Sequence, residues 1–151
     1  MIASAQTLLD KSPLKPFYLA QQTAFGMTFG PGSAGYDIRV DQHLHINPGE
    51  FVLAASLEQF HMPDDLLGVV HDKSTWVRQG LTVQNTVIEP GWRGYLTLEL
   101  INHSNDTIIL QAGMPIAQII FHLLDHPTQC PYAGKYQDQP PGPQPAILEK
   151  E

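Results

Sequence analysis

The sequence predicts an all-β fold, a barrel or a sandwich built from short strands. Candidate strands recur at short intervals along the chain, separated by Pro-Asp, Gly and His-Ser-Asn-Asp breaks, and helical periodicity is almost absent. Many short strands with turn signals between them are typical of antiparallel barrels and sandwiches. A chain of 151 residues is the size of one domain.

The expected elements follow in order from the amino terminus. Residues 2–10 carry apolar side chains at helical spacing, and Pro13 and Pro16 end this short helix. Residues 23–35 are rich in glycine and are expected to be irregular. Strands are then expected at residues 36–40, 51–55, 67–70, 81–83, 95–102, 107–110 and 116–123.

From Tyr132 onward the chain changes character, because repeated Pro and Gly residues forbid regular structure. We therefore expect one folded domain at residues 1–131. Residues 132–151 are expected to form a flexible arm that folds over a bound ligand.

Composition excludes several classes of protein. The net charge of −7 argues against a broad basic surface for polymeric nucleic acid. No apolar run approaches the ~20 residues that span a membrane, and the amino terminus lacks the pattern of a secretory signal, so a cytoplasmic location is expected. Cys130 is the only cysteine, which excludes an internal disulfide and a thiolate zinc site.

The strand expected at residues 95–102 has two different faces. Leu96, Leu98 and Leu100 alternate with more polar residues and mark a core face. Glu99 lies on the other face, and a second carboxylate, Glu89, precedes the Pro-Gly turn just before this strand. A charged group in a largely apolar strand loses hydration, so it must be paired, protonated or used in chemistry.

The few cations gather beside Gly, Ser and Gln residues. The segment from Lys73 to Gly80 offers two hydroxyls and two cations, which suit phosphate oxygens. The segment from Tyr132 to Gln139 adds a further cation, an amide and aromatic rings. Such a pattern suits one small polyanion better than a long one.

Taken together, these motifs resemble the dCTP deaminase and dUTPase superfamily over about residues 33–143. Lys73-Ser74-Thr75-x-x-Arg78-x-Gly80-Leu81 resembles the phosphate and catalytic segment of the deaminases. Ile88-Glu89-Pro90-Gly91-Trp92-x-Gly94-x-x-x-Leu98-Glu99 is similar to their central motif. Gly113-Met114-Pro115-Ile116-Ala117-Gln118 and Tyr132-x-Gly134-Lys135-Tyr136-Gln137-x-Gln139 match a turn near their subunit contacts and their closing arm.

The resemblance implies a homotrimer of distorted, dUTPase-like β-barrels of the β-clip type that binds a deoxynucleoside triphosphate between subunits. It implies catalytic roles for Glu99, Ser74 and Arg78. It also implies contacts with the nucleotide from Lys73, Ser74, Thr75, Arg78, Glu89, Trp92, Thr97, Leu98, Tyr132, Lys135 and Gln139. Mg²⁺ would arrive with the triphosphate, with Asp37 acting on it through water.

The expected reaction is the hydrolysis of dCTP to dUTP and ammonia, with hydrolysis of dUTP as a further activity. One desolvated carboxylate can activate the water and protonate the departing amine, and the ligand set for a zinc-dependent route is absent. The first alternative is a dUTP diphosphatase, because the interval from Arg78 to Glu89 and the segment from Ser33 to Asp37 are similar to dUTPases. The second alternative is a non-catalytic nucleotide-binding regulator.

Overall fold

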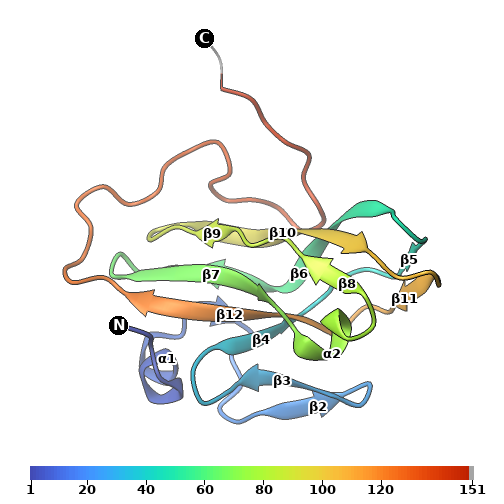
Figure 1. Ribbon diagram of the computed structural model, residues 1–151. Helices are drawn as coiled ribbons and strands as arrows, with labels where there is room; N and C mark the ends of the chain where they lie inside the picture. The colour runs from blue at the N-terminus through green and yellow to red at the C-terminus, as the bar shows by residue number, and fades with distance from the viewer. Residues whose placement is uncertain (150–151) are drawn as a thin grey trace.

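The computed structural model describes residues 1–149 as an all-β fold with two short helices (Figure 1). The helices are α1 (Ala5–Lys11) and α2 (Ser74–Val77). The strands are β1 (Leu14–Lys15), β2 (Gln22–Ala24), β3 (Met27–Pro31), β4 (Tyr36–Arg39), β5 (Leu44–Ile46), β6 (Phe51–His61), β7 (Leu66–Asp72), β8 (Leu81–Val83), β9 (Val87–Ile88), β10 (Arg93–Asn102), β11 (Ile108–Leu110) and β12 (Pro115–Leu123).

The strands form three sheets that share one core. One sheet has the order β1-β6-β10-β8, a second has the order β2-β3-β4-β12-β7-β9, and β5 pairs with β11. Leu98 and Leu100 of β10 and Ile119 and Phe121 of β12 are fully buried members of the same apolar cluster. The all-β prediction is therefore confirmed, and the core joins strands that are distant in sequence.

The predicted helix and strands are confirmed, and the largest change of boundary is in β6, which runs from Phe51 to His61 where the sequence predicts residues 51–55. Helix α1 begins after Ser4, whose hydroxyl accepts the Thr7 amide, and it ends at Ser12 in the left-handed conformation (φ 42°) just before Pro13. Strands β6 and β10 both extend beyond the predicted ranges. They pair antiparallel along most of their length.

The expectation that residues 23–35 are irregular is wrong. Strands β2 and β3 form an antiparallel hairpin in which Ala24 pairs with Met27. The two residues between them, Phe25 and Gly26, have φ values of 52° and 73°. This combination gives the tight two-residue turn that matches the twist of a hairpin. Phenylalanine is an unusual residue at the first of these positions, so the turn carries no clear sequence signal.

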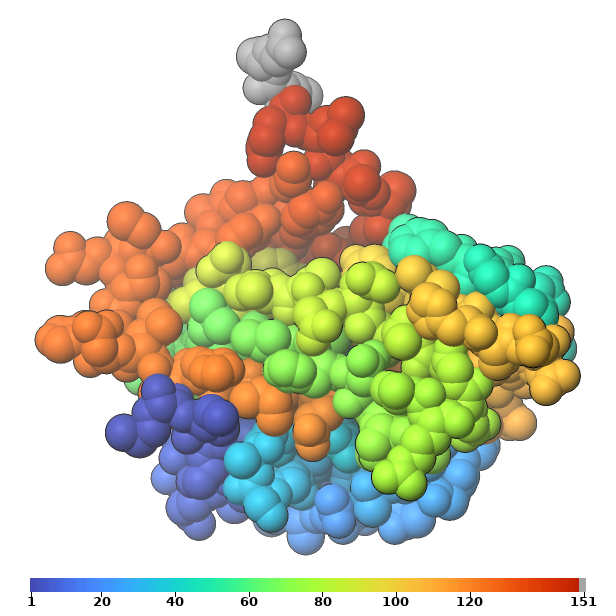
Figure 2. Space-filling model, viewed as in Figure 1, coloured from blue at the N-terminus to red at the C-terminus, as the bar shows by residue number. Residues whose placement is uncertain are grey.

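The chain after Leu123 contains no further strand or helix up to residue 149. It loops out beside β12 and then crosses above β9 and β10 (Figure 1). In the space-filling view it forms an orange-to-red ridge on top of the barrel (Figure 2). We call residues 132–149 the arm; its flexibility stays a prediction. Within residues 1–149 no helix is long and apolar enough to cross a membrane.

Candidate active site

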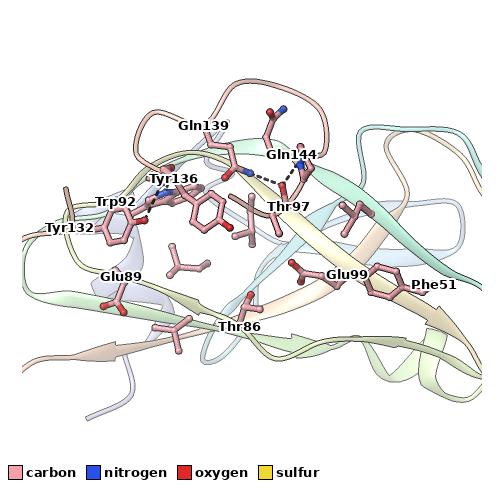
Figure 3. A pocket seen from close by; sticks show the side chains of 16 residues that line it. Phe51, Thr86, Glu89, Trp92, Thr97, Glu99, Tyr132, Tyr136, Gln139 and Gln144 are labelled. Atoms are coloured by element: carbon pink, nitrogen blue, oxygen red, sulfur yellow. Dashed lines mark hydrogen bonds between the residues drawn. The ribbon is translucent and has the colours of Figure 1, made fainter. Parts of the chain in front are cut away.

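A pocket of about 460 Å³ lies between β10 and the arm (Figure 3). Its walls come from the start of β6, from the segment around β9, from β10 and from the arm. The lining residues are Phe51, Leu53, Thr86, Val87, Ile88, Glu89, Trp92, Leu96, Thr97, Glu99, Tyr132, Tyr136, Gln139, Gln144, Pro145 and Ala146. Most of them are apolar or aromatic, and two of them, Glu89 and Glu99, carry carboxylates.

The alternation along β10 places Thr97 and Glu99 in this pocket. Leu98 between them is fully buried in the core, so its side chain points to the opposite face. An irregularity in the pairing with β6 precedes Thr97, since Tyr95 is paired with Gln59 and Thr97 with Ala55.

This irregularity is a β-bulge, and the Ser56 hydroxyl forms hydrogen bonds with two backbone groups there. Its Oγ accepts the Leu96 amide at 2.9 Å and donates to the Glu58 carbonyl at 2.7 Å. The bulge therefore leaves no buried amide unpaired at Leu96 while it re-aims the strand just before Thr97.

Glu99 is the most unusual carboxylate in the pocket. Its Oε2 atom is buried and has no hydrogen-bond partner within residues 1–149. Burial raises the pKa of the Glu99 carboxyl above its ordinary value. A buried carboxylate oxygen without a donor favours the protonated form, so this group can hold and release a proton closer to neutral pH than an exposed glutamate. Figure 3 shows it facing the same hollow as Thr86.

Glu89 lies at the other end of the pocket and is exposed (Figure 3). It follows β9 and precedes the Pro90-Gly91 turn, whose Gly91 has a φ of 81°. A β-carbon at Gly91 would lie 2.5 Å from the Pro131 Cβ, so only glycine allows the start of the arm to approach this turn. The turn thus places Glu89 and Tyr132 on the same rim.

The arm closes the pocket through polar contacts with β10 and the turn. The Thr97 hydroxyl oxygen accepts hydrogen bonds from Gln139 Nε2 at 2.5 Å and from the Gln144 backbone amide at 3.1 Å. The indole Nε1 of the buried Trp92 donates to the Tyr136 carbonyl at 2.7 Å. Gln139 also forms a parallel bridge with Gly94. These contacts bring Gln139 and Gln144 over the strand that carries Glu99.

The predicted phosphate-binding cations lie elsewhere. Among residues 1–149 the pocket lining contains no Lys or Arg. Lys73 is buried, and its Nζ donates to Asp37 Oδ2 at 2.5 Å and to the Thr28 hydroxyl at 3.4 Å. Lys135 lies 3.3 Å from a Glu149 carboxylate oxygen and 5.5 Å from the centre of the Tyr136 ring.

The hydroxyls and cation around α2 are exposed and also lie outside the pocket. Ser74 and Thr75 belong to α2, and Arg78 follows it directly. The structure therefore brings together Glu89, Trp92, Thr97, Glu99, Tyr132 and Gln139. It places Lys73, Ser74, Thr75, Arg78, Leu98, Lys135 and Asp37 outside the pocket lining.

Several lining residues were not predicted. Leu53 is paired with Glu99 and Phe51 with Ile101 across the β6–β10 ladder. The period of two along residues 51–55 could have shown that they share a face. Thr86 comes from a loop and Gln144 from the arm, and neither position carries a periodic signal.

Comparison with known proteins adds independent information. A family model described as dCTP deaminase-like matches residues 33–124. The chain is 42% identical over 110 residues to a Methanopyrus kandleri protein named "dCTP deaminase, dUMP-forming", covering 68% of this chain but only 57% of that protein. It is 35% identical over 119 residues to a Thermococcus kodakarensis dCTP deaminase, covering 69% of this chain and 77% of that one.

A solved structure has the same fold. The native dUTPase of EIAV matches with a TM-score of 0.55 at 23% sequence identity, covering 67% of this chain and 84% of the dUTPase. At this identity the match supports the dUTPase-like barrel and says nothing further about chemistry.

Proposed function

Because the chain belongs to the dCTP deaminase-like family, we propose that it hydrolyses dCTP to dUTP and ammonia. The observation that carries the proposal is Glu99, a carboxyl group with a raised pKa and an unpartnered buried oxygen in a mostly apolar pocket. In the proposed reaction Glu99 takes a proton from water as the oxygen attacks C4 of cytosine. It then delivers the proton to N4, and the C4–N4 bond breaks to release ammonia.

We infer that the triphosphate is held by a second subunit of a homotrimer. The pocket presents carboxylates but no cation from residues 1–149 of its own chain, and a triphosphate needs cations. Ser74, Thr75 and Arg78 are exposed on and beside α2, where they are free to face a neighbouring chain. In this arrangement Ser74 and Arg78 of the partner subunit would face the open side of the pocket, hold the phosphates and complete the site.

Magnesium would be carried by the nucleotide, whose phosphate oxygens would hold it. Within residues 1–149 no group of three or more His, Cys, Asp or Glu side chains could hold a metal ion. Asp37 Oδ1 is a buried carboxylate oxygen without a hydrogen-bond partner, so it can accept a hydrogen bond from a water on the ion. The ion would neutralise charge on the triphosphate.

A second activity, release of pyrophosphate to leave dUMP, is favoured by two observations. The Methanopyrus relative carries the words dUMP-forming in its name. Glu89 is exposed and lines the same pocket as Glu99, which would allow it to orient a second water toward the α-phosphate.

The activity is tested by offering dCTP and dUTP separately to the protein with Mg²⁺ and measuring ammonia and pyrophosphate in each reaction. We expect ammonia from dCTP, and pyrophosphate as well if the second activity is present. Pyrophosphate from dUTP without ammonia from dCTP would identify a diphosphatase. Nucleotide binding without either product would identify a non-catalytic regulator. Either result would overturn the proposed deamination.

Light scattering should give about three times the 16.7 kDa of one chain. Sharing of the site is tested by co-expressing Glu99→Gln and Arg78→Ala chains, each inactive alone. If every site takes Glu99 from one chain and Arg78 from the next, random mixing makes about one quarter of the sites complete. We therefore expect about a quarter of the wild-type rate. A rate no higher than that of the separate variants would show that each site lies within one chain.

A further inference from the structure

The start of the arm is tied to the turn that carries Glu89 by a set of backbone hydrogen bonds. The Tyr132 amide donates to the Pro90 carbonyl at 2.8 Å, and the Asp138 amide donates to the Arg93 carbonyl at 2.9 Å. The Tyr95 amide donates to the Gln139 carbonyl at 3.0 Å. The arm therefore follows the chain from the turn into β10 rather than crossing it at a single point.

One side chain, that of Gln137, connects the arm to both the turn and the start of β10. Gln137 Nε2 donates to the Gly91 carbonyl at 3.0 Å and to the Tyr132 carbonyl at 2.9 Å. Its Oε1 accepts the Arg93 amide at 2.8 Å. A single neutral amide thus bonds to backbone groups of the turn, of the start of β10 and of the arm itself. Only a side chain with two donors and an acceptor can make this set of bonds.

The backbone of β10 leaves room for the arm at Gly94. Gly94 has a φ of 144°, and a β-carbon there would lie 2.7 Å from the Gln139 amide nitrogen. The close approach at Gly94 and the amide at Gln137 both fix Gln139 over Thr97. By contrast, Arg93 donates to both carboxylate oxygens of Asp138, but both side chains are exposed, so solvent screens this ion pair.

We propose that Gln137 is a positioning residue that locks the arm onto the turn after Glu89 and so sets the closed form of the pocket. It does not itself line the pocket, so it acts through Tyr132 and Gln139, which do. Its effect on dCTP turnover rests on the proposed function. Its effect on the arm does not, because the hydrogen bonds are made within one chain.

The role of Gln137 in holding the arm on the turn is tested by hydrogen exchange on the full-length protein without nucleotide. In Gln137→Ala and Gln137→Glu the hydrogen-bonded amides of the arm, those of Tyr132, Tyr136, Gln137, Asp138 and Gln144, should exchange about ten-fold faster or more, because loss of two or three hydrogen bonds makes local opening easier. Glutamate has the shape of glutamine but cannot donate to the Gly91 and Tyr132 carbonyls. Unchanged exchange of β7 and β12 amides in the same spectra shows that the barrel is folded.

Asp138→Asn is the matched control. It changes the adjacent residue, keeps the side-chain size and suits the positive φ of 58° at this position, but it removes only the exposed ion pair. Arm exchange in this variant should stay within about two-fold of wild type. Wild-type exchange in the arm of Gln137→Ala would overturn the proposal, as would equal acceleration in Asp138→Asn.

Kinetics separate positioning from a general loss of structure. Gln137→Ala should raise KM for dCTP by about ten-fold or more and lower kcat less, because saturating substrate can close a loosened arm. An equal fall of kcat at unchanged KM would contradict the proposal. If wild type proves inactive on dCTP, the exchange experiment still decides whether Gln137 locks the arm.

Discussion

Replacing Glu99 with glutamine should lower the rate of ammonia release from dCTP by about 10²- to 10⁴-fold. Glutamine keeps the shape of the side chain but cannot take a proton from water. In the wild type the carboxylate form must act, and burial raises the pKa of Glu99, so kcat should increase as the pH rises through a value above that of an ordinary glutamate. This rising limb should be absent in the residual activity of the variant.

Binding and a control variant test whether the effect is chemical. The affinity of Glu99→Gln for dCTP should stay within about a factor of three of wild type, because the pocket loses no volume. Glu50→Gln should retain full activity, since Glu50 accepts the Asn47 amide in a turn and does not line the pocket. A Glu99→Gln protein that releases ammonia at the wild-type rate would remove Glu99 from the mechanism.

Removing the chain from Tyr132 onward should lower kcat/KM for dCTP by about 10²-fold or more. The truncation takes away one wall of the pocket, namely Tyr132, Tyr136, Gln139, Gln144, Pro145 and Ala146. It also opens Glu99 to water, which should return its pKa toward the ordinary value and weaken the electrostatic interactions in the pocket. Nucleotide affinity should fall with the loss of Tyr132 and Gln139, which line the pocket.

The barrel itself should survive this truncation. No fully buried member of the apolar core comes from the arm, and only Tyr132 of its residues packs against that core. Circular dichroism should show a cooperative unfolding transition close to that of the full chain. A truncated protein that binds and turns over dCTP like the full chain would show that the arm does not form part of the site.

The residues of strand 95–102 were sufficient to place Glu99 correctly. A period of two fixes which side chains share a face, and the leucines identify the core face, so Thr97 and Glu99 had to lie opposite Leu98. The hairpin of β2 and β3 could not be found in the same way. Its turn begins with Phe25 in a conformation that sequence signals assign to Gly or Asn.

The contacts that the sequence does not predict at the site are those between segments far apart in the chain. The sequence predicts that Lys73 contacts phosphate, and it gives no sign that Lys73 pairs with Asp37, which lies far away in the sequence on β4. Likewise, nothing in the residues from Tyr132 to Gln139 reveals that the Gln137 amide reaches the Gly91 carbonyl. Such pairings follow from tertiary packing, and local periodicity does not encode them.

The most direct test of the central claim is a crystal structure of the Glu99→Gln variant with dCTP and Mg²⁺. We expect cytosine in the pocket beneath the arm, with C4 and N4 next to the side chain of residue 99. The phosphates should contact Ser74 and Arg78 from an adjoining subunit. Cytosine bound outside this pocket, or a pose in which residue 99 faces neither C4 nor N4, would contradict the assignment of Glu99 as the deaminating carboxylate.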